Sequence, residues 1–181
     1  QNWAGNKWGA FFFPRVGQEV LVEFINGDPD QPIISGAIYN ADLMPPYALP
    51  AKKTQSGIKS HSTKNGGADN FNELRFEDDK GKELLFFQAE KDHELKVKHD
   101  QKDTIDNDRL TTIANNDTLD VGNILKMTAG SEIEFKTGGA SIKMTSDGSI
   151  TIKGTNIKVQ GTDIKVNGTS ITMKAPQIKL N

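Results

Sequence analysis

The sequence predicts an all-β protein: a short barrel-like first part followed by a long repetitive shaft. Three observations predict this class. The last third of the chain repeats short rows of alternating apolar and polar residues. Residues 1–50 alternate strand-like runs with turns rich in Gly, Pro and Asn, and residues 73–98 have the pattern of a hairpin. Alternation with a period of two places apolar side chains on one face of a β-strand, so all three patterns indicate β structure.

Residues 1–50 are expected to form about three strands, at residues 8–13, 19–25 and 33–39. The segments 14–17 and 26–32 carry dense turn signals, and Gly36 is expected at a bulge. A five-stranded barrel of the OB type needs more strands than this. Either the missing strands lie before Gln1, or these residues are the last piece of a truncated barrel. Asp28 and Asp30 lie in a turn, where acids form turns far more often than they bind cations.

The middle of the chain divides into two further parts. Residues 51–72 are expected to be a connector, and residues 73–121 a hairpin followed by an irregular start of the shaft. In the hairpin, residues 73–77 and 83–88 are the strands and 78–82 the turn. His93 and His99 lie six residues apart and match no zinc pattern. The pairs Leu95/Val97 and Leu119/Val121 already have the spacing of the later rows.

Residues 122–181 form the regular part of the shaft. Eight rows each begin with Gly or another turn-forming residue, at positions 122, 130, 139, 147, 154, 161, 168 and 175, so the step is eight or nine residues at first and then seven. Each row carries two apolar residues separated by one polar residue. The pairs are Leu125/Met127, Ile133/Phe135, Ile142/Met144, Ile150/Ile152, Ile157/Val159, Ile164/Val166, Ile171/Met173 and Ile178/Leu180.

The spacing inside a row decides its structure. A coiled coil needs apolar residues at i and i+3, whereas these pairs lie at i and i+2, on one face of a strand. One short strand cannot bury its own pair, so the rows are expected to stack as a triangular β-helix. The triangle could close within one chain or between three chains. The shortening of the step predicts a shaft that narrows towards Asn181.

Composition and charge limit the function classes. The chain has no cysteine, no apolar run long enough to span a membrane and no signal peptide, and it begins with Gln1, as expected for a fragment of a longer protein. Residues 73–120 carry a net charge of about −6 and residues 122–181 about +4, by counting Lys, Arg, Asp and Glu. The basic shaft could attract an anionic membrane, although outward lysines also keep a β-rod soluble, which is the simpler interpretation.

Several motifs in a fixed order resemble one known family. They are WAGNKWG at residues 3–9, PRVGQEV at 14–20, NGDPDQP at 26–32, and NELRFED at 72–78 followed by GKE at 81–83. Together they resemble VgrG, the spike protein of the bacterial type VI secretion system, which is similar in turn to the cell-puncturing spike of tailed bacteriophages. The resemblance covers nearly the whole chain. It implies that residues 1–50 are the C-terminal part of an OB-like domain, and that an intertwined, trimeric, triple-stranded β-helix begins at Gly122.

The resemblance also implies partners and a location. The chain would form a homotrimer whose core is the sixteen paired side chains above. The trimer would sit on a tube of Hcp rings through an N-terminal part that this chain lacks, contact the target membrane transiently, and carry effectors. It would be assembled in the bacterial cytoplasm and then secreted. A PAAR-repeat tip protein is expected on the last row, namely Ala175, Pro176, Gln177, Ile178, Lys179, Leu180 and Asn181.

Other functions were weighed against a spike. Some β-helices cleave polysaccharides with paired carboxylates, and Asp100, Asp103, Asp106 and Asp108 could supply such pairs, but they lie in an Asp/Asn/Thr run typical of turns. A phage tail spike or a passive adhesin would have a similar shaft. The lysines lack an aromatic platform for nucleic acid. We expect no enzyme activity, cofactor, metal or nucleic-acid partner.

Overall fold

The structure is a computed structural model that describes residues 2–178. It divides into two compact units, residues 1–104 and 105–181, which are considered separately below. The described residues are all-β apart from one turn of 3₁₀-helix, η1 (Ile25–Gly27), which confirms the predicted class. Within residues 2–178, no helix has the length and apolar character needed to cross a bilayer.

The first unit opens with a small hairpin where the sequence predicted one strand over residues 8–13. Strand β1 (Ala4–Gly5) pairs antiparallel with β2 (Trp8–Gly9), and residues 10–13 lie outside any strand. The prediction was wrong here because it overlooked the turn. Lys7 adopts a positive φ of 65° and reverses the chain, and Trp3 packs edge-on against Trp8 with ring centroids 5.3 Å apart.

The second hairpin follows the prediction closely. Strand β3 (Val20–Phe24) pairs antiparallel with β4 (Pro32–Ala37), and η1 and the Asp28 turn connect them. The register shifts between Leu21, which faces Gly36, and Val22, which faces Ile34. One extra residue on β4 at this point is a β-bulge, as the sequence predicted for the neighbourhood of Gly36.

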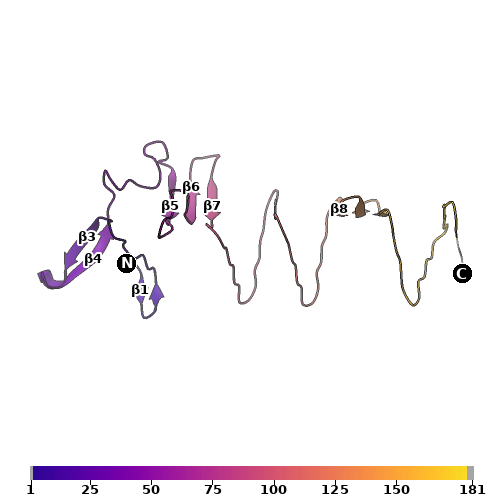
Figure 1. Ribbon diagram of the computed structural model, residues 1–181, viewed down its shortest axis with the longest axis horizontal. Helices are drawn as coiled ribbons and strands as arrows, with labels where there is room; N and C mark the ends of the chain where they lie inside the picture. The colour runs from indigo at the N-terminus through magenta and orange to yellow at the C-terminus, as the bar shows by residue number, and fades with distance from the viewer. Residues whose placement is uncertain (1, 179–181) are drawn as a thin grey trace. The chain divides into compact units, whose positions relative to one another are not determined.

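A three-stranded sheet completes the regular part of the first unit. Strands β5 (Gln55–Lys59), β6 (Glu73–Glu77) and β7 (Leu84–Gln88) are arranged in sequence order, and both pairs are antiparallel (Figure 1). The β6–β7 hairpin confirms the pattern at residues 73–88. Strand β5 lies inside the segment expected to be a connector, and its sequence, QSGIK, has too few apolar residues to show the strand pattern.

The second unit contains one paired sheet, at the start of the regular rows. Strands β8 (Glu132–Thr137), β9 (Ala140–Thr145) and β10 (Ile150–Lys153) form an antiparallel meander, with β9 in the centre. A two-residue Gly138–Gly139 turn joins β8 to β9, and Gly138 has a φ of 52°. Gly–Gly is favoured in such turns because its backbone reaches positive φ without a side-chain clash.

The meander corrects our explanation of the longer steps. We attributed steps of eight and nine residues to wider rows and inferred a narrowing shaft. In the structure, the rows between residues 130 and 153 are strands of one meander, and the extra residues form its turns, Gly138–Gly139 and the loop around Asp147. Adjacent rows of this segment therefore pair with each other inside one chain.

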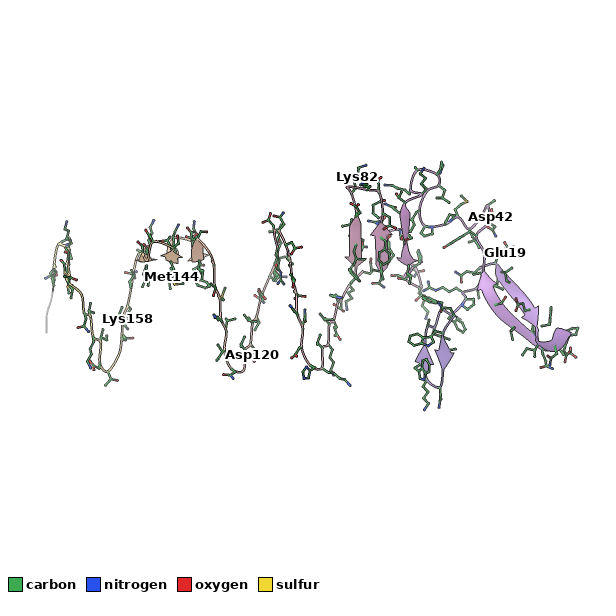
Figure 2. The ribbon with its side chains drawn as sticks, turned by 180° about the vertical axis from the view of Figure 1, so that it is seen from behind. Glu19, Asp42, Lys82, Asp120, Met144 and Lys158 are labelled. Atoms are coloured by element: carbon green, nitrogen blue, oxygen red, sulfur yellow. The ribbon has the colours of Figure 1, made fainter. Side chains whose placement is uncertain are left out.

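Outside the meander, the described residues of the second unit form no paired strands. Figure 2 shows Met144 on the small sheet, and Asp120 and Lys158 on open stretches on either side of it. After Lys153 the described chain bends at residues 155–156, 162–163, 169 and 176, at intervals of about one row. These bends fall where the sequence predicted the row-start turns. Strand pairing for these rows would have to come from outside the single chain.

An apolar surface without a core

The described residues include no buried apolar side chain, which is the most unusual physical property of this chain. The accessible surface is 17817 Å² for 19.8 kDa. A folded monomer of this mass exposes roughly 8,600 Å² by the usual scaling of surface with mass. The single chain therefore exposes about twice the expected surface. Its apolar side chains need a partner to cover them.

The exposed large apolar residues of the regular rows lie at the predicted pair positions, except Ile124 of the first row. In the row that begins at Gly161, the exposed fractions are 51% for Ile164 and 68% for Val166. The preceding and following rows are similar, and Ile178 is also exposed. Lys179, Leu180 and Asn181, which belong to the predicted tip-binding row, lie outside the described residues. Of the sixteen predicted trimer-core side chains, thirteen are exposed in the single chain, Ile133 and Met144 are partly exposed, and Leu180 lies outside the described residues.

For the first of the eight rows, residues 122–129, the predicted strand is absent from the structure. The sequence predicted that Leu125 and Met127 lie on a short strand and belong to a core. In the structure residues 119–130 contain no strand, and the side chains of Leu125 and Met127 are each 56% exposed. Strand structure requires a hydrogen-bonded neighbour, and no other row of the single chain pairs with this one. Burial of Met127 in a core therefore stays a prediction, because it would require contacts with other copies of the chain.

Each regular row after the meander has the same local geometry. A Cβ added at Gly161 would lie 3.2 Å from Cγ1 of Ile164, three residues later. The corresponding distances are 3.6 Å from Gly154 to Ile157 and 3.8 Å from Gly168 to Ile171. The row-start residue therefore lies close to the first apolar side chain of its own row. A larger residue at Gly161 would push Ile164 out of this position.

The meander separates an apolar face from a charged face. Cross-strand pairs Ile133–Met144–Ile150 and Phe135–Ile142–Ile152 lie on one face. The exposed fractions of Phe135 and Ile142 are 52% and 45%. On the other face, Lys143 of the central strand lies opposite Glu134, and its Nζ lies 2.5 Å from a carboxylate oxygen of Glu132. The hydrogen bond to Glu132 raises the pKa of Lys143.

The loop between β9 and β10 is held by the Asp147 carboxylate. Its Oδ1 accepts hydrogen bonds from the Thr145 hydroxyl (2.6 Å) and the Ser149 backbone N–H (2.9 Å). These hydrogen bonds, chiefly the one from Thr145, lower the pKa of Asp147. Gly148 completes the loop with a φ of 89°. The side chain of one exposed acid therefore fixes the turn that aligns β10 with β9.

A polar cluster in the first unit was not predicted. Glu73 of β6 is 6% exposed and is the one residue classed as buried among those described. Its carboxylate accepts a hydrogen bond from the Tyr47 hydroxyl (3.0 Å) and lies 3.4 Å from Nη1 of Arg75. The Arg75 guanidinium also lies over the Phe86 ring, 4.7 Å from its centroid. Glu73 and Arg75 are two apart on one strand, and that spacing is the sequence signal that could have indicated the pair.

Gly57 allows this cluster to form. A Cβ at this position would lie 2.6 Å from the Tyr47 hydroxyl and would clash with the backbone oxygen of Leu74. Burial, together with the hydrogen bond to Glu73, raises the pKa of Tyr47. The cluster thus joins the segment before β5 to the β5–β7 sheet.

The acids considered for catalysis or cation binding do not converge. Asp28 uses both carboxylate oxygens within its own turn, accepting from the Asp30 N–H (3.0 Å) and Gln31 Nε2 (2.7 Å). Asp103 accepts from Gln101, and Asp100 lies 2.9 Å from Nδ1 of His99, with both side chains about 90% exposed. Among residues 2–178, no group of three His, Cys, Asp or Glu side chains is arranged to hold a metal ion.

The first unit also has an apolar hollow of about 830 Å³. Phe11, Phe13 and Ile34 contribute to its lining, and Arg15 closes one side by donating a hydrogen bond of 2.5 Å to the backbone oxygen of His61. Phe11 and Phe13 lie with ring centroids 6.1 Å apart. The hollow offers apolar contact area but no group of acid, base and nucleophile.

Comparison with known proteins explains the uncovered surface. Residues 56–169 match the family model of the bacteriophage T4 gp5 C-terminal trimerisation domain. The chain belongs to this family. The gp5 trimerisation family model covers the β5–β7 sheet, the meander and two of the seven-residue rows that follow it. Residues 1–39 match the type VI secretion system and phage-baseplate injector OB domain, which confirms the OB-like part of the predicted fold.

Curated relatives of this gp5-type chain are spike proteins. It is 53% identical over 113 residues to type VI secretion system spike protein VgrG1b of Pseudomonas aeruginosa, covering 62% of this chain and 15% of the relative. It is 43% identical over 179 residues to VgrG1a of the same organism, covering 86% of this chain and 28% of the relative. The predicted resemblance to VgrG is confirmed.

One further relative is named as a toxin. Actin cross-linking toxin VgrG1 of Vibrio cholerae is 45% identical over 121 residues, covering 67% of this chain and 10% of the relative. The chain thus spans less than a third of the length of each of these three relatives.

Proposed function

We propose that this chain is the OB-domain end and trimeric shaft of a membrane-puncturing spike in a type VI secretion system. The observation that carries the proposal is the uncovered apolar surface of a chain whose family is defined by trimerisation. Three copies would place the row pairs around a common axis and cover them. Burial of each Ile, Val, Leu or Met contributes roughly 1.5–3 kcal/mol.

The proposed role is mechanical. A shaft of rows shared by three chains opens only if many hydrogen bonds and apolar contacts break together. The contracting machine would supply the energy, and the shaft would transmit force to the target membrane without chemistry of its own. The distribution of acids in the first unit and along the rows supports a role without catalysis. The assembled spike would form in the bacterial cytoplasm and leave the cell through the secretion machine.

The partners of the spike follow the same proposal. A PAAR-repeat tip protein would sit on the last row, residues 175–181, and effectors would travel on the spike or its tip. The Hcp tube would contact the spike through parts of the protein outside this sequence. Ala175, Pro176 and Gln177, which are not predicted core positions, are exposed in the described chain, and this supports an accessible last row.

Light scattering of the purified chain tests the trimer. We expect a mass three times the chain's 19.8 kDa, and a band that resists mild heating in SDS. Both results would mean that the shaft is built from three chains together. A monomer of 19.8 kDa would contradict the proposal, because one chain would have to cover its own rows. Cleavage of peptidoglycan or capsule that Asp106→Ala abolished would contradict the mechanical role.

A further inference from the structure

The regular rows after Lys153 specify their alignment with other copies poorly. The first apolar position is Ile in each row, at residues 157, 164, 171 and 178, and the second is Val159, Val166, Met173 or Leu180. A copy displaced by seven residues would therefore present the same or a similarly sized side chain at each core position. Such volume-conserving exchanges are the least costly changes in a packed core. Uniform strands are prone to slip for this reason.

The meander is the place where the repeat is broken. Residues 132–153 reverse direction twice inside one chain, through the Gly138–Gly139 turn and the Asp147 loop. The meander also carries Phe135, the sole aromatic residue of the sequence after Phe87. A copy displaced by one row would place an extended row against a meander, and Phe135 against a smaller aliphatic residue.

Such a displacement would disturb both packing and hydrogen bonding. An aromatic ring in a layer shaped for Ile or Val overfills that layer, and the vacated layer is left with a void. The antiparallel hydrogen-bond pattern of β8 and β10, the two edges of the meander, also differs from that of a plain extended row. Neither penalty arises when the three meanders lie at the same level.

The face that would make this contact is defined by the structure. Phe135 and Ile142 are half exposed on the apolar face, while the opposite face carries the Lys143–Glu132 ion pair and Glu134. In the sequence, the apolar residues of this face are followed directly by the apolar pairs of the later rows. This face, together with the later pairs up to residue 169, lies within the residues matched by the trimerisation family. Its occupants are therefore the two other copies of this chain.

We propose that the meander of residues 132–153 is a register lock, which fixes the axial alignment of the three chains before the uniform rows pair. The inference rests on the proposed trimer. The meanders of three copies pack through their apolar faces, with Phe135 as the unique landmark. When the three chains are aligned in this way, their last rows lie at the same axial level and form a flat end of the shaft.

Single cysteines can report the alignment, because the chain has none of its own. Val159 and Met173 occupy the same position two rows apart. Stacked strands are about 4.8 Å apart, so these positions lie about 9.6 Å apart in an aligned trimer. That distance exceeds the Cβ separation of roughly 3.5–4.5 Å that a disulfide needs. Mixed trimers of Val159→Cys and Met173→Cys chains should therefore cross-link only after a slip of two rows, which brings the two positions level.

The decisive variant replaces residues 130–153 by three copies of the row GTDIKVN, taken from residues 161–167. Its matched control replaces residues 154–174 by the same three rows, retains the reporter cysteines at positions 159 and 173, and leaves the meander intact. We expect at least a tenfold rise in the 159–173 cross-link when the meander is removed, equivalent to about 1.4 kcal/mol, and no rise in the control. Each mixture is assembled at equal chain concentrations and oxidised under mild conditions.

Each outcome separates the inference from the proposed trimer. A trimer that lacks the meander but cross-links no more than the control would overturn the register lock and leave the spike proposal intact. A monomeric parent chain would overturn the trimer, and the lock with it. If removal of the meander prevents assembly, Phe135→Ile in the full chain decides: increased 159–173 cross-linking supports the lock, and an unchanged level overturns it.

Discussion

At the residue scale, two acids stabilise the structure by different means. Glu73 is buried and is satisfied by Tyr47 and Arg75, so it joins segments that are distant in the sequence. Asp147 is exposed and closes a loop between residues that are adjacent in the sequence. Loss of a buried partner leaves other groups uncompensated, whereas loss of an exposed loop acceptor mainly loosens the turn.

Replacing Glu73 by Ala should destabilise the β5–β7 sheet by about 2–3 kcal/mol, since Tyr47 and Arg75 would lose a charged partner in a shielded site. Tyr47→Phe is the control, because it removes one hydrogen bond and should cost only about 1 kcal/mol. Urea unfolding followed by circular dichroism measures both. Equal stability of Glu73→Ala and the parent chain would contradict a stabilising role for this cluster.

The Asp147 loop should weaken in acid. Because hydrogen bonding lowers the pKa of Asp147 in the folded chain, its contribution is fully present above the unfolded value of about 3.9 and is lost as pH falls through the lower folded value. Hydrogen exchange at the Ser149 amide, compared between pH 6 and pH 3 after correction for intrinsic rates, should show the loss. Asp147→Asn should remove the pH dependence of this protection, and an unchanged dependence would rule out Asp147 as the titrating group.

At the element scale, a row has one apolar and one polar side. Ile164 and Val166 flank Lys165, whose charged side chain lies 2.9 Å from the Asp163 carboxylate. The row-start bends repeat this arrangement along residues 154–178. The same substitution should therefore have opposite consequences at neighbouring positions.

Ile164→Asp should prevent or strongly weaken trimer formation, because it would place three carboxylates in the shared core, at about 3–5 kcal/mol for each uncompensated charge. Lys165→Asp is the matched control, one residue away on the outer face, and should leave the mass unchanged. Light scattering distinguishes them. Equal trimer yields from the two variants would mean that the first apolar position does not face the core.

At the scale of the whole molecule, folding and assembly should be one event. The single chain buries no apolar side chain among its described residues, so little remains to hold the rows once the copies separate. Hydrophobic burial is the main favourable term in folding. For this chain, apolar side chains can be buried chiefly in contacts between copies of the chain.

The melting temperature should accordingly rise with protein concentration, as expected when assembly and folding are linked. Circular dichroism at two concentrations tenfold apart measures the shift, and light scattering during the melt follows the mass. Loss of β signal and loss of the trimer should coincide. A melting temperature independent of concentration, with a folded monomer surviving the transition, would contradict this coupling.

The candidate surface was largely predictable from the sequence, because side-chain alternation is a local property. The pairs Ile157/Val159 and Ile164/Val166 indicated one apolar face, and both are exposed together in the single chain. The β6–β7 hairpin and the bulge near Gly36 were found from the same local signals. Strand β5 was missed because Gln55, Ser56 and Gly57 give no alternation, and pairing with β6 makes this segment a strand.

The sequence by itself determined that this is a β protein, which rows repeat, and which side chains are apolar, since these follow from local spacing. The tertiary structure decided which rows pair within the chain. Rows 130–153 form a meander because Gly138–Gly139 and Asp147–Gly148 can reverse the backbone and bring adjacent rows together. The described seven-residue rows after Lys153 bend at residues 155–156, 162–163 and 169 but do not reverse into paired strands. Strand pairing depends on where the turns place distant backbone groups. The apolar pattern is the same in the paired and the unpaired rows, so it does not indicate which rows pair.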